Sequence, residues 1–398
     1  MPLPPLTRFP RRAPGVAALL AACTALAACG SSDAPTAASS PSAHAAYPVT
    51  VASCGVPVTY DRAPARAVSN DINTTEDMLT LGLEPHMAGT FGVTGDGPAG
   101  DPVPAQYLPG FRKVRQVSPG YFTREELVGL HPDFLFAGWD YGLQQGTSLT
   151  PAGLSQFGIK TLVLTESCAR VQKGINTVSL NGTYTDLRNL GEIFNVRAKA
   201  QQVIAAMQHQ VAAAHAKVAS LKPVTVFDYD SGQASPFTGA GLAIPTALLT
   251  LAGGTNIFGG LKQSFTSVSW EQVVSKDPQC IIINDYGTPT AAQKEKFLET
   301  SPITRNLTAV KNHCFLPLAY DEITPGPATP WPSPPSPAGC TQPPSASPPT
   351  APPDRHHKES ESSDCIRIRG RPGKIATPVR GKADGSGPAG GGQLSGGR

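Results

Sequence analysis

The feature that most constrains the fold is a segment that occurs twice, once on each side of a long helical stretch. Residues 124–142 read REELVGLHPDFLFAGWDYG, and residues 270–287 read WEQVVSKDPQCIIINDYG. In both copies a glutamate precedes a proline by seven residues, an apolar strand follows, and the strand ends in Asp-Tyr-Gly. This internal repeat predicts two similar halves.

Residues 197–221, between the two copies, predict one long helix. The stretch is rich in Ala and Gln and contains no Gly or Pro. Its apolar residues recur near the helical period at Val203, Ile204, Met207, Val211, Ala214 and Val218. An ordinary packed surface helix would satisfy this pattern, but similar halves on both sides favour a strut that joins two lobes.

Short apolar strands alternate with helical segments on both sides of this helix. This alternation indicates parallel sheets flanked by helices. We therefore expect an α/β fold of two lobes with mainly parallel sheets, joined by one long rigid helix. Two helix starts are predicted from capping patterns, one at residues 73–76 and one at the Thr123 and Glu126 capping box. The expected lobes are residues 47–182 and 223–326, with residues 183–222 as the linker that contains the helix.

The N-terminus has the pattern of an export signal. Arg8, Arg11 and Arg12 precede a short apolar run that is too short to span a membrane. Residues 26–32, LAACGSS, resemble a bacterial lipobox, which predicts a signal peptide over residues 1–28 and lipidation at Cys29. Residues 29–46 are rich in Ser, Ala and Pro and are expected to form a flexible tether. A plain secretory signal is the alternative.

Export makes disulfides possible, and four cysteines lie between the tether and Glu322. Cys54 and Cys168 precede the long helix, whereas Cys280 and Cys314 follow it. If each half closes its own bridge, the pairs are Cys54–Cys168 and Cys280–Cys314, although four cysteines allow three connectivities.

The net charge of +3 conceals an acidic body. The signal carries +3 and the region from Ile323 onward carries +4, which leaves residues 30–322 at −4. The basic ends therefore give no support for a nucleic-acid partner.

The C-terminal region changes character after Glu322. Thirteen prolines lie between Pro325 and Pro353, and the chain then becomes basic and finally Gly-rich. Residues 327–398 are expected to form a disordered tail. A second hypothesis is a frameshift near Pro327. If the codons of this region end mostly in G or C, another reading frame of the same DNA can encode an arginine directly after Pro327. An Ala/Leu-rich helix that ends in Leu-His-Pro would follow it. The C-terminal lobe would then be truncated in this chain.

The order of these motifs resembles the substrate-binding lipoproteins of ABC importers for ferric siderophores and cobalamin. The resemblance covers about Cys54 to Gly326 and rests on segments such as residues 63–68 (APARAV), 130–133 (LHPD), 236–239 (PFTG) and 252–258 (AGGTNIF). It implies the type III fold of periplasmic binding proteins, which has a helical backbone and holds its ligand in a cleft between two lobes. It also implies a permease dimer as partner, docked through one carboxylate per lobe, here Glu125 and Glu271. We expect a monomer that is lipid-anchored to the outer face of the cell membrane.

The predicted cleft lies beyond the carboxyl ends of the strands, where open α/β sheets bind ligands. Aromatic and acidic residues gather at these ends or are expected nearby. The candidate cleft residues are Phe91, Trp139, Tyr141, Tyr229, Phe237, Trp270, Tyr286, Tyr320 and Asp321. Aromatic walls suit a bulky, partly apolar chelate, and the acids disfavour an anionic one. We therefore predict an iron-siderophore ligand of the hydroxamate type, with cobalamin or another organic cofactor as the alternative.

Other functions have less support from the sequence. The histidines of the body are scattered, so a bare metal ion has no predicted protein ligands, and no cofactor is expected. The chain has no G-x-S-x-G elbow, P-loop, H-E-x-x-H or dinucleotide-binding motif, which argues against an enzyme. An exported cell-wall hydrolase and an adhesion or scaffold lipoprotein are the alternatives of another class.

Overall fold

The computed structural model describes residues 47–93 and 103–327. All of them belong to one compact unit of the chain. The predicted signal peptide, the lipidation site Cys29, the tether and the C-terminal tail with its alternative frame lie outside the described residues. Within the described ranges, no helix is both long and apolar enough to cross a membrane.

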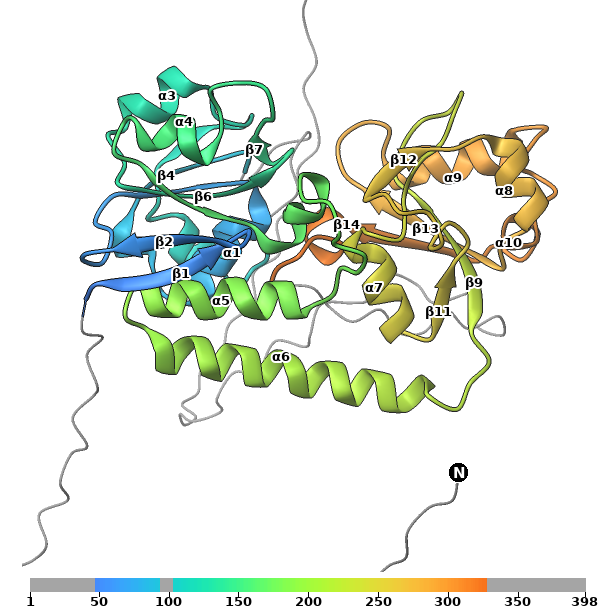
Figure 1. The fold of residues 1–398 in the computed structure, drawn as a ribbon. Helices are drawn as coiled ribbons and strands as arrows, with labels where there is room; N and C mark the ends of the chain where they lie inside the picture. Colours follow the sequence, from blue (N-terminus) through green and yellow to red (C-terminus); the bar gives the residue numbers. More distant parts are fainter. Residues whose placement is uncertain (1–46, 94–102, 328–398) are drawn as a thin grey trace, which may run out of the picture. The chain divides into compact units, whose positions relative to one another are not determined.

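The N-terminal lobe is built on a parallel six-stranded sheet (Figure 1). Its order is β5-β4-β3-β6-β7, and β8 also pairs with β6. The strands are β3 (Ala67–Asn70), β4 (Met87–Phe91), β5 (Gln116–Ser118), β6 (Phe134–Trp139), β7 (Gly142–Leu143) and β8 (Lys160–Val163). An antiparallel hairpin of β1 (Val49–Ser53) and β2 (Val56–Tyr60) precedes the sheet. The strands β3 and β6 are almost fully buried. Burial on both faces explains the apolar run of β6, whereas β3 ends in Ser69 and Asn70, whose buried side chains are hydrogen-bonded.

Short helices connect these strands. They are α1 (Ile72–Thr80), η1 (Glu84–His86), α2 (Leu108–Phe111), α3 (Arg124–Gly129), α4 (Pro151–Ser155), η2 (Thr165–Arg170) and α5 (Asn181–Ile193). The predicted capping box at the start of α3 is confirmed, because the Thr123 side chain accepts the Glu126 N–H and Glu126 accepts the Thr123 N–H. The predicted cap at residues 73–76 is wrong. Asp71 caps α1 instead, and the helix begins at Ile72.

The C-terminal lobe has a parallel four-stranded sheet of order β11-β9-β13-β14. Its strands are β9 (Val224–Tyr229), β11 (Gly254–Asn256), β13 (Cys280–Asp285) and β14 (Phe315–Ala319). An antiparallel pair, β10 (Phe237–Gly239) and β12 (Phe265–Ser267), lies beside it. The helices are α7 (Ile244–Leu251), α8 (Trp270–Lys276), α9 (Ala291–Thr300), α10 (Thr308–Lys311) and η3 (Tyr320–Glu322).

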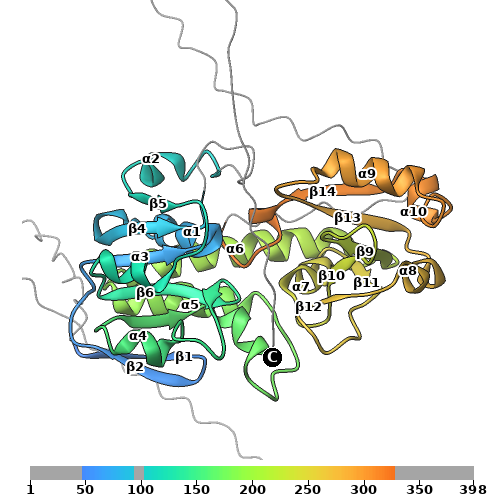
Figure 2. The ribbon, with the colours of Figure 1, turned by 90° about the horizontal axis from the view of Figure 1, so that it is seen from above.

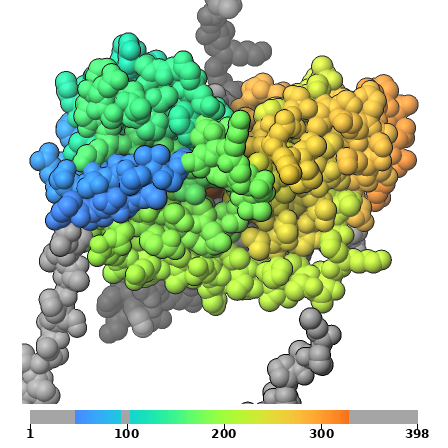
Figure 3. Space-filling view, viewed as in Figure 1, coloured from blue at the N-terminus to red at the C-terminus, as the bar shows by residue number. Residues whose placement is uncertain are grey.

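The long helix α6 (Arg197–Val218) packs against both lobes. It contacts α5 of the N-terminal lobe and α7 of the C-terminal lobe (Figure 1). One continuous hydrophobic core joins Leu187, Ile204, Met207 and Leu248 of these three helices. Much of the remaining helix surface is exposed, and in Figure 3 the helix forms the yellow-green lower edge of the molecule. The two-lobe α/β class with a helical strut is therefore confirmed.

Two disulfides each stay within one lobe, and they are the pairs expected from one bridge per half. Cys54 and Cys168 tie the end of the β1–β2 hairpin to η2. Cys280 and Cys314 join the amino ends of the neighbouring strands β13 and β14. The first bridge therefore holds η2, which follows the carboxyl end of β8, whereas the second bridge lies at the amino ends of the strands in its sheet.

Candidate functional site

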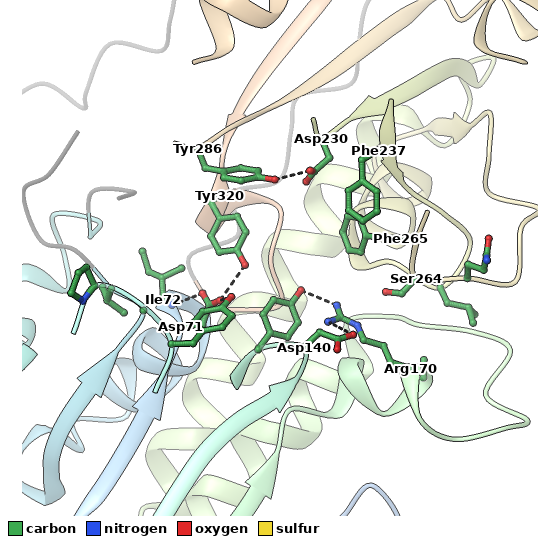
Figure 4. Close-up of a pocket in the computed structure, with 18 of the residues that line it drawn as sticks. Asp71, Ile72, Asp140, Arg170, Asp230, Phe237, Ser264, Phe265, Tyr286 and Tyr320 are labelled. Carbon is green, nitrogen blue, oxygen red and sulfur yellow. Dashed lines mark hydrogen bonds and ion pairs between the residues drawn. The ribbon is translucent and has the colours of Figure 1, made fainter. Parts of the chain in front are cut away.

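A cavity of about 790 Å³ lies at the carboxyl ends of strands from both lobes (Figure 4). Residues that directly follow β3, β4, β6, β9, β13 and β14 line it. The lining residues are Asp71, Ile72, Gly92, Val93, Pro119, Tyr121, Asp140, Tyr141, Ala169, Arg170, Asp230, Phe237, Leu242, Lys262, Gln263, Ser264, Phe265, Tyr286 and Tyr320. The position agrees with the general rule that α/β sheets bind ligands beyond the carboxyl ends of their strands.

Asp71 forms the polar centre of the N-terminal wall. Its side chain is buried at the start of α1 and accepts the Ile72 N–H at 2.6 Å. The hydroxyl of Tyr121 donates to Asp71 Oδ2, and the hydroxyl of Tyr320 donates to the same oxygen at 3.2 Å. Burial raises the pKa of Asp71, while these three donors act in the opposite direction. The donor set therefore favours the ionised carboxylate.

Arg170 forms a second polar centre on the same lobe. Its Nη1 donates to the Trp139 carbonyl at 2.7 Å, and its Nη2 donates to the Tyr141 hydroxyl at 3.0 Å. The guanidinium lies 4.4 Å from the Tyr141 ring centroid, a cation–π distance. It also pairs with Glu166 at 3.4 Å and with Asp140 at 3.7 Å. Two carboxylates therefore offset this cation before any ligand binds.

The C-terminal wall has a corresponding carboxylate, Asp230. Its Oδ1 accepts the Tyr286 hydroxyl at 2.6 Å, and its Oδ2 accepts the Asn284 amide at 3.2 Å. Lys294 is buried beneath this wall and donates to the carbonyls of Asp230 and Asn284 at 2.7 and 2.5 Å. Its Nζ lies 4.8 Å from the Tyr286 ring centroid. These contacts fix the position of Tyr286.

Phe237 and Phe265 provide an apolar surface between the polar groups. The two rings stack with centroids 5.8 Å apart, because β10 and β12 pair side by side. Both side chains line the cavity (Figure 4). A planar or bulky apolar part of a ligand can pack on this surface.

Two hydrogen bonds join the lobes across the cavity. Tyr320 of the C-terminal lobe donates to Asp71, and Ser264 donates to Glu166 at 3.4 Å. The rings of Tyr286 and Tyr320 also meet with centroids 5.4 Å apart. After Tyr320, the chain turns back toward α1, where Gly326 lies close to Glu76 (Figure 2).

Four of the nine predicted cleft residues line the cavity: Tyr141, Phe237, Tyr286 and Tyr320. Tyr141 and Tyr286 occupy matching places in the internal repeat, in Asp-Tyr-Gly directly after β6 and β13. The repeat therefore contributes one tyrosine from each lobe to the cavity.

The other five predicted cleft residues do not line this cavity. Phe91, Tyr229 and Trp270 belong to the cores and are at most 3% exposed. Trp139 packs against the N-terminal core and offers only its carbonyl, to Arg170. Asp321 is buried beside Tyr320. Alternation along a strand explains Phe91, Trp139 and Tyr229, since the next residue of each strand end lines the cavity instead. Trp270 begins α8 and Asp321 lies in η3, and packing turns both side chains away from the cavity.

Other residues that line the cavity were not predicted: Asp71, Tyr121, Arg170 and the loop that contains Ser264 and Phe265. Asp71 has a signal in the sequence, because it directly follows the strand β3 as Asp230 follows β9. Arg170 and Ser264 follow no such pattern. Tertiary structure alone brings them to the cavity.

The two predicted docking carboxylates are exposed. Glu125 lies in the first turn of α3 and pairs with Arg124 at 2.8 Å, and Glu271 lies in the first turn of α8. A hydrogen bond from Arg124 lowers the pKa of Glu125. Both side chains are therefore charged and accessible at neutral pH.

Among the described residues, no group of three or more His, Cys, Asp or Glu is arranged to hold a metal ion. The side chains that a ligand can contact at the candidate site are mainly tyrosines, carboxylates and phenylalanines.

Known proteins with similar sequences or structures are binding proteins. The vitamin B12-binding protein of Salmonella choleraesuis is 28% identical over 180 residues, which cover 45% of this chain and 62% of that protein. This chain thus spans less than two thirds of that relative. A periplasmic binding protein of Veillonella parvula is 28% identical with a TM-score of 0.60, and the match covers 71% of this chain and 93% of that one.

A crystal structure of an ABC-type Fe3+-hydroxamate transport system from Saccharomonospora viridis shares the fold, with a TM-score of 0.59. It is 22% identical, and the match covers 71% of this chain and 94% of that one.

The family profile described as "Periplasmic binding protein" matches residues 68–317, which is more than half of the chain and includes the strands that end at the cavity. Membership of this family agrees with the prediction of a binding protein without a cofactor, rather than an enzyme. On this match, the chain belongs to the periplasmic binding protein family.

Proposed function

We propose that this protein is the extracytoplasmic substrate-binding component of an ABC importer and captures a metal chelate in the cavity between its lobes. The observation that carries this proposal is the cavity itself. It takes residues from both lobes, includes stacked Phe237 and Phe265, and has a volume within the range of small-molecule sites.

Within this class, we favour a ferric siderophore of the hydroxamate type. Three carboxylates line the cavity, Asp71, Asp140 and Asp230, against two cationic side chains, Arg170 and Lys262. Arg170 is already paired with Asp140 and Glu166. A strongly anionic catecholate complex would meet this acidic surface unfavourably, whereas a neutral or cationic hydroxamate complex would not.

Cobalamin is the second candidate. Relatives from Salmonella and Vibrio that match this chain at 28–29% identity are vitamin B12-binding proteins, and one from Halobacterium salinarum at 27% is a cobalamin-binding protein. The aromatic surface and the tyrosine hydroxyls of the cavity are also compatible with a corrinoid, which has amide groups at its edge.

Intrinsic fluorescence titration tests these candidates directly, because four tyrosines line the cavity. The purified exported chain is titrated with ferrioxamine, a ferric catecholate and cyanocobalamin. We expect saturable quenching by ferrioxamine at the lowest concentration. Preferential binding of the catecholate contradicts the charge argument, and preferential binding of cyanocobalamin selects the second candidate. Native mass spectrometry after exposure to mixed siderophores and corrinoids identifies any other ligand.

Membrane attachment and permease docking are parts of the same proposal. Cys29 is the proposed lipidation site, and Glu125 and Glu271 are the proposed contacts with a permease dimer. A monomer anchored in this way keeps the cavity accessible outside the cell. Globomycin-sensitive processing and palmitate labelling that Cys29→Ser abolishes would support the anchor, whereas unchanged labelling would exclude Cys29.

A further inference from the structure

One end of the cavity presents hydrogen-bond acceptors to a ligand. This acceptor seat consists of Asp71, Tyr121, Asp230, Tyr286 and Tyr320, all of which line the cavity (Figure 4). We propose that the acceptor seat binds a primary ammonium group of the transported ligand. The inference rests on the proposed function and specifies which part of the ligand lies where.

The hydroxyl proton of each tyrosine in this seat already forms a hydrogen bond within the protein. Tyr121 and Tyr320 donate to Asp71, and Tyr286 donates to Asp230. A phenol has one proton, so each of these oxygens can offer only lone pairs to a ligand. Burial raises the pKa of Tyr286 and of Tyr320, so both hydroxyls remain protonated donors to their carboxylates. A ligand group that meets these oxygens must therefore donate hydrogen bonds.

The charges in the seat favour a cation among the possible donors. Asp71 receives three hydrogen bonds and Asp230 receives two, a pattern that stabilises two carboxylates. The rings of Tyr286 and Tyr320 lie at 62° to each other and add aromatic surface that attracts a cation. An ammonium group has three donors, which suits several acceptors that surround one point.

Two cationic side chains act on the seat. Burial raises the pKa of Asp71 and the charge of Arg170 acts to lower it, but Arg170 is itself paired with Asp140 and Glu166. Lys294 approaches the seat from inside the C-terminal lobe. It is 1% exposed, does not line the cavity, and is held by the carbonyls of Asp230 and Asn284. Its charge offsets one of the two carboxylates. The seat therefore keeps a net negative charge toward the ligand.

The rest of the cavity has a different character, so the ligand has a defined orientation. Phe237 and Phe265 provide the apolar surface, and Arg170 lies apart from Asp71, Tyr286 and Tyr320 (Figure 4). The Arg170 guanidinium packs against the Tyr141 ring. Tyr141 accepts from Arg170, so its own proton is available to a ligand oxygen. We expect the ammonium group at the acceptor seat and the chelate oxygens near Tyr141.

A matched pair of ligands tests this inference by calorimetric titration of the wild-type chain. Ferrioxamine B carries a free primary ammonium group, and its N-acetyl derivative has the same iron chelate without that charge. We expect ferrioxamine B to bind at least tenfold more tightly. Equal affinities, or tighter binding of the acetylated form, would overturn the inference while leaving the proposed function intact.

Variants locate the preference within the cavity. Asp230→Asn removes one charge of the seat and is expected to bring the affinity ratio of the two ligands close to one. Tyr286→Phe, which keeps the ring, serves as a second variant if Asp230→Asn does not fold. Phe265→Leu is the control, because it alters the apolar surface and is expected to weaken both ligands equally. An unchanged ratio in folded Asp230→Asn or Tyr286→Phe would contradict the proposed location.

If neither ferrioxamine binds, the hydroxamate assignment fails, and the seat is tested separately. Pentylammonium chloride and 1-pentanol are then compared as probes by perturbation of tyrosine signals in NMR spectra. Saturable binding of pentylammonium that exceeds that of pentanol tenfold, and that Asp230→Asn removes, supports the seat. Equal effects of the two probes overturn it.

Discussion

Buried carboxylates of the N-terminal lobe differ in whether they have hydrogen-bond donors. Asp71 and Asp186 accept several hydrogen bonds each. Asp186 accepts them from the N–H and hydroxyl of Thr165 at 3.0 and 2.6 Å. Glu76 and Asp77 in α1 are at most 1% exposed, and within residues 47–93 and 103–327 their carboxyl oxygens have no hydrogen-bond partner. A buried charge without donors is costly. These two residues are therefore sites where stability depends on pH.

Glu76→Gln is expected to stabilise the protein at neutral pH. Burial raises the pKa of Glu76 well above its ordinary value of 4.5, and nearby Asp321 and Asp77 add to the effect. Since the folded state binds this proton more tightly than the unfolded state, the contribution of Glu76 to stability is greatest below pH 4.5 and falls as the pH rises toward the folded pKa. Glutamine cannot ionise, so the variant avoids this loss.

Urea denaturation of Glu76→Gln from pH 4 to pH 8 checks this expectation. The advantage of the variant should grow with pH and reach about 1–3 kcal/mol, the range for a buried polar group without a partner. Exposed Glu271→Gln is the control and should show no gain with pH, because a hydrogen bond from Ser269 lowers the pKa of Glu271. A variant advantage that is constant or falls with pH would contradict the assignment.

Lys294 is expected to be a positioning residue for the C-terminal wall of the cavity. Lys294→Met keeps the aliphatic stem but leaves the carbonyls of Asp230 and Asn284 without this donor. We expect a loss of about 2–4 kcal/mol in unfolding free energy, because two buried acceptors lose a partner. Weaker ligand binding should accompany it, since Tyr286 loses its support.

Lys296→Met is the matched control, because Lys296 is exposed on the same helix. Denaturation and fluorescence titration of both variants provide the comparison. Equal behaviour of the two lysine variants would show that Lys294 does not position the wall.

At the scale of elements, the two disulfides are expected to have different effects on ligand binding. The Cys54–Cys168 bridge holds η2, the element that brings Arg170 to the cavity. The Cys280–Cys314 bridge lies at the amino ends of β13 and β14, away from the residues that line the cavity. Removing the first bridge should therefore reduce affinity, whereas removing the second should affect stability alone.

The bridges also differ in the length of chain that they close. Their sequence separations are 114 and 34 residues. On the loop-entropy model, replacement of the longer bridge by two serines costs about 1 kcal/mol more than replacement of the shorter. Denaturation and titration of the two double-serine variants test both expectations. Peptide mapping without reductant verifies the pairs, and a peptide that joins the two lobes would refute them.

The segment after β14 gives physical support to the proposed change of reading frame. Residues 321–326 are largely buried and approach α1, and a Cβ on Gly326 would lie 3.5 Å from a Glu76 oxygen. The alternative frame gives an arginine directly after Pro327. We propose that this arginine would pair with Glu76, a buried carboxylate that has no donor among the described residues.

Resequencing the gene and expressing the chain in the alternative frame test this proposal. We expect third-base choices that encode the Ala/Leu-rich helix, and a higher unfolding free energy for the restored chain. In that chain, Glu76→Gln should destabilise, which is the reverse of its effect in the present chain. Codons that do not encode the helix, or a stabilising Glu76→Gln in the restored chain, would exclude the proposal.

At the scale of the whole molecule, we propose lobes over residues 47–182 and 223–326 that move little relative to each other. The helix α6 shares one hydrophobic core with helices of both lobes, and two hydrogen bonds cross the cavity. A packed core resists large hinge motion. The cavity is therefore expected to be largely preformed before ligand binds.

Charge reversal at Glu125 and Glu271 should separate transport from ligand capture. Both residues are exposed and neither lines the cavity. Glu125→Lys with Glu271→Lys is expected to reduce uptake of iron-loaded ligand by cells at least tenfold, because the permease contacts would become repulsive. Affinity of the purified protein for the same ligand should change less than twofold. Glu299→Lys is the control, and normal uptake by the double variant would exclude these contacts.

The sequence by itself determined the class of fold, the strut and the edge of the sheets where the cavity lies. Strand and helix periodicity, the internal repeat and a proline-free helix are local patterns, and they were sufficient to place Tyr141 and Tyr286 at equivalent strand ends. The capping box at Thr123 was equally local and was predicted correctly.

Only the tertiary structure decided which side chains meet in the cavity. Tyr229 and Trp270 lie near strand ends or helix starts, as the predicted site required, but they face the core, because the direction of a side chain depends on its neighbours in space. Arg170, Ser264 and Asp71 come from distant segments and meet through packing of the two lobes. The same packing decides the direction of the hydrogen bonds. The carboxylates of Asp71 and Asp230 accept hydrogen bonds from the hydroxyls of Tyr320 and Tyr286, so the tyrosine oxygens of the acceptor seat can only accept hydrogen bonds from a ligand.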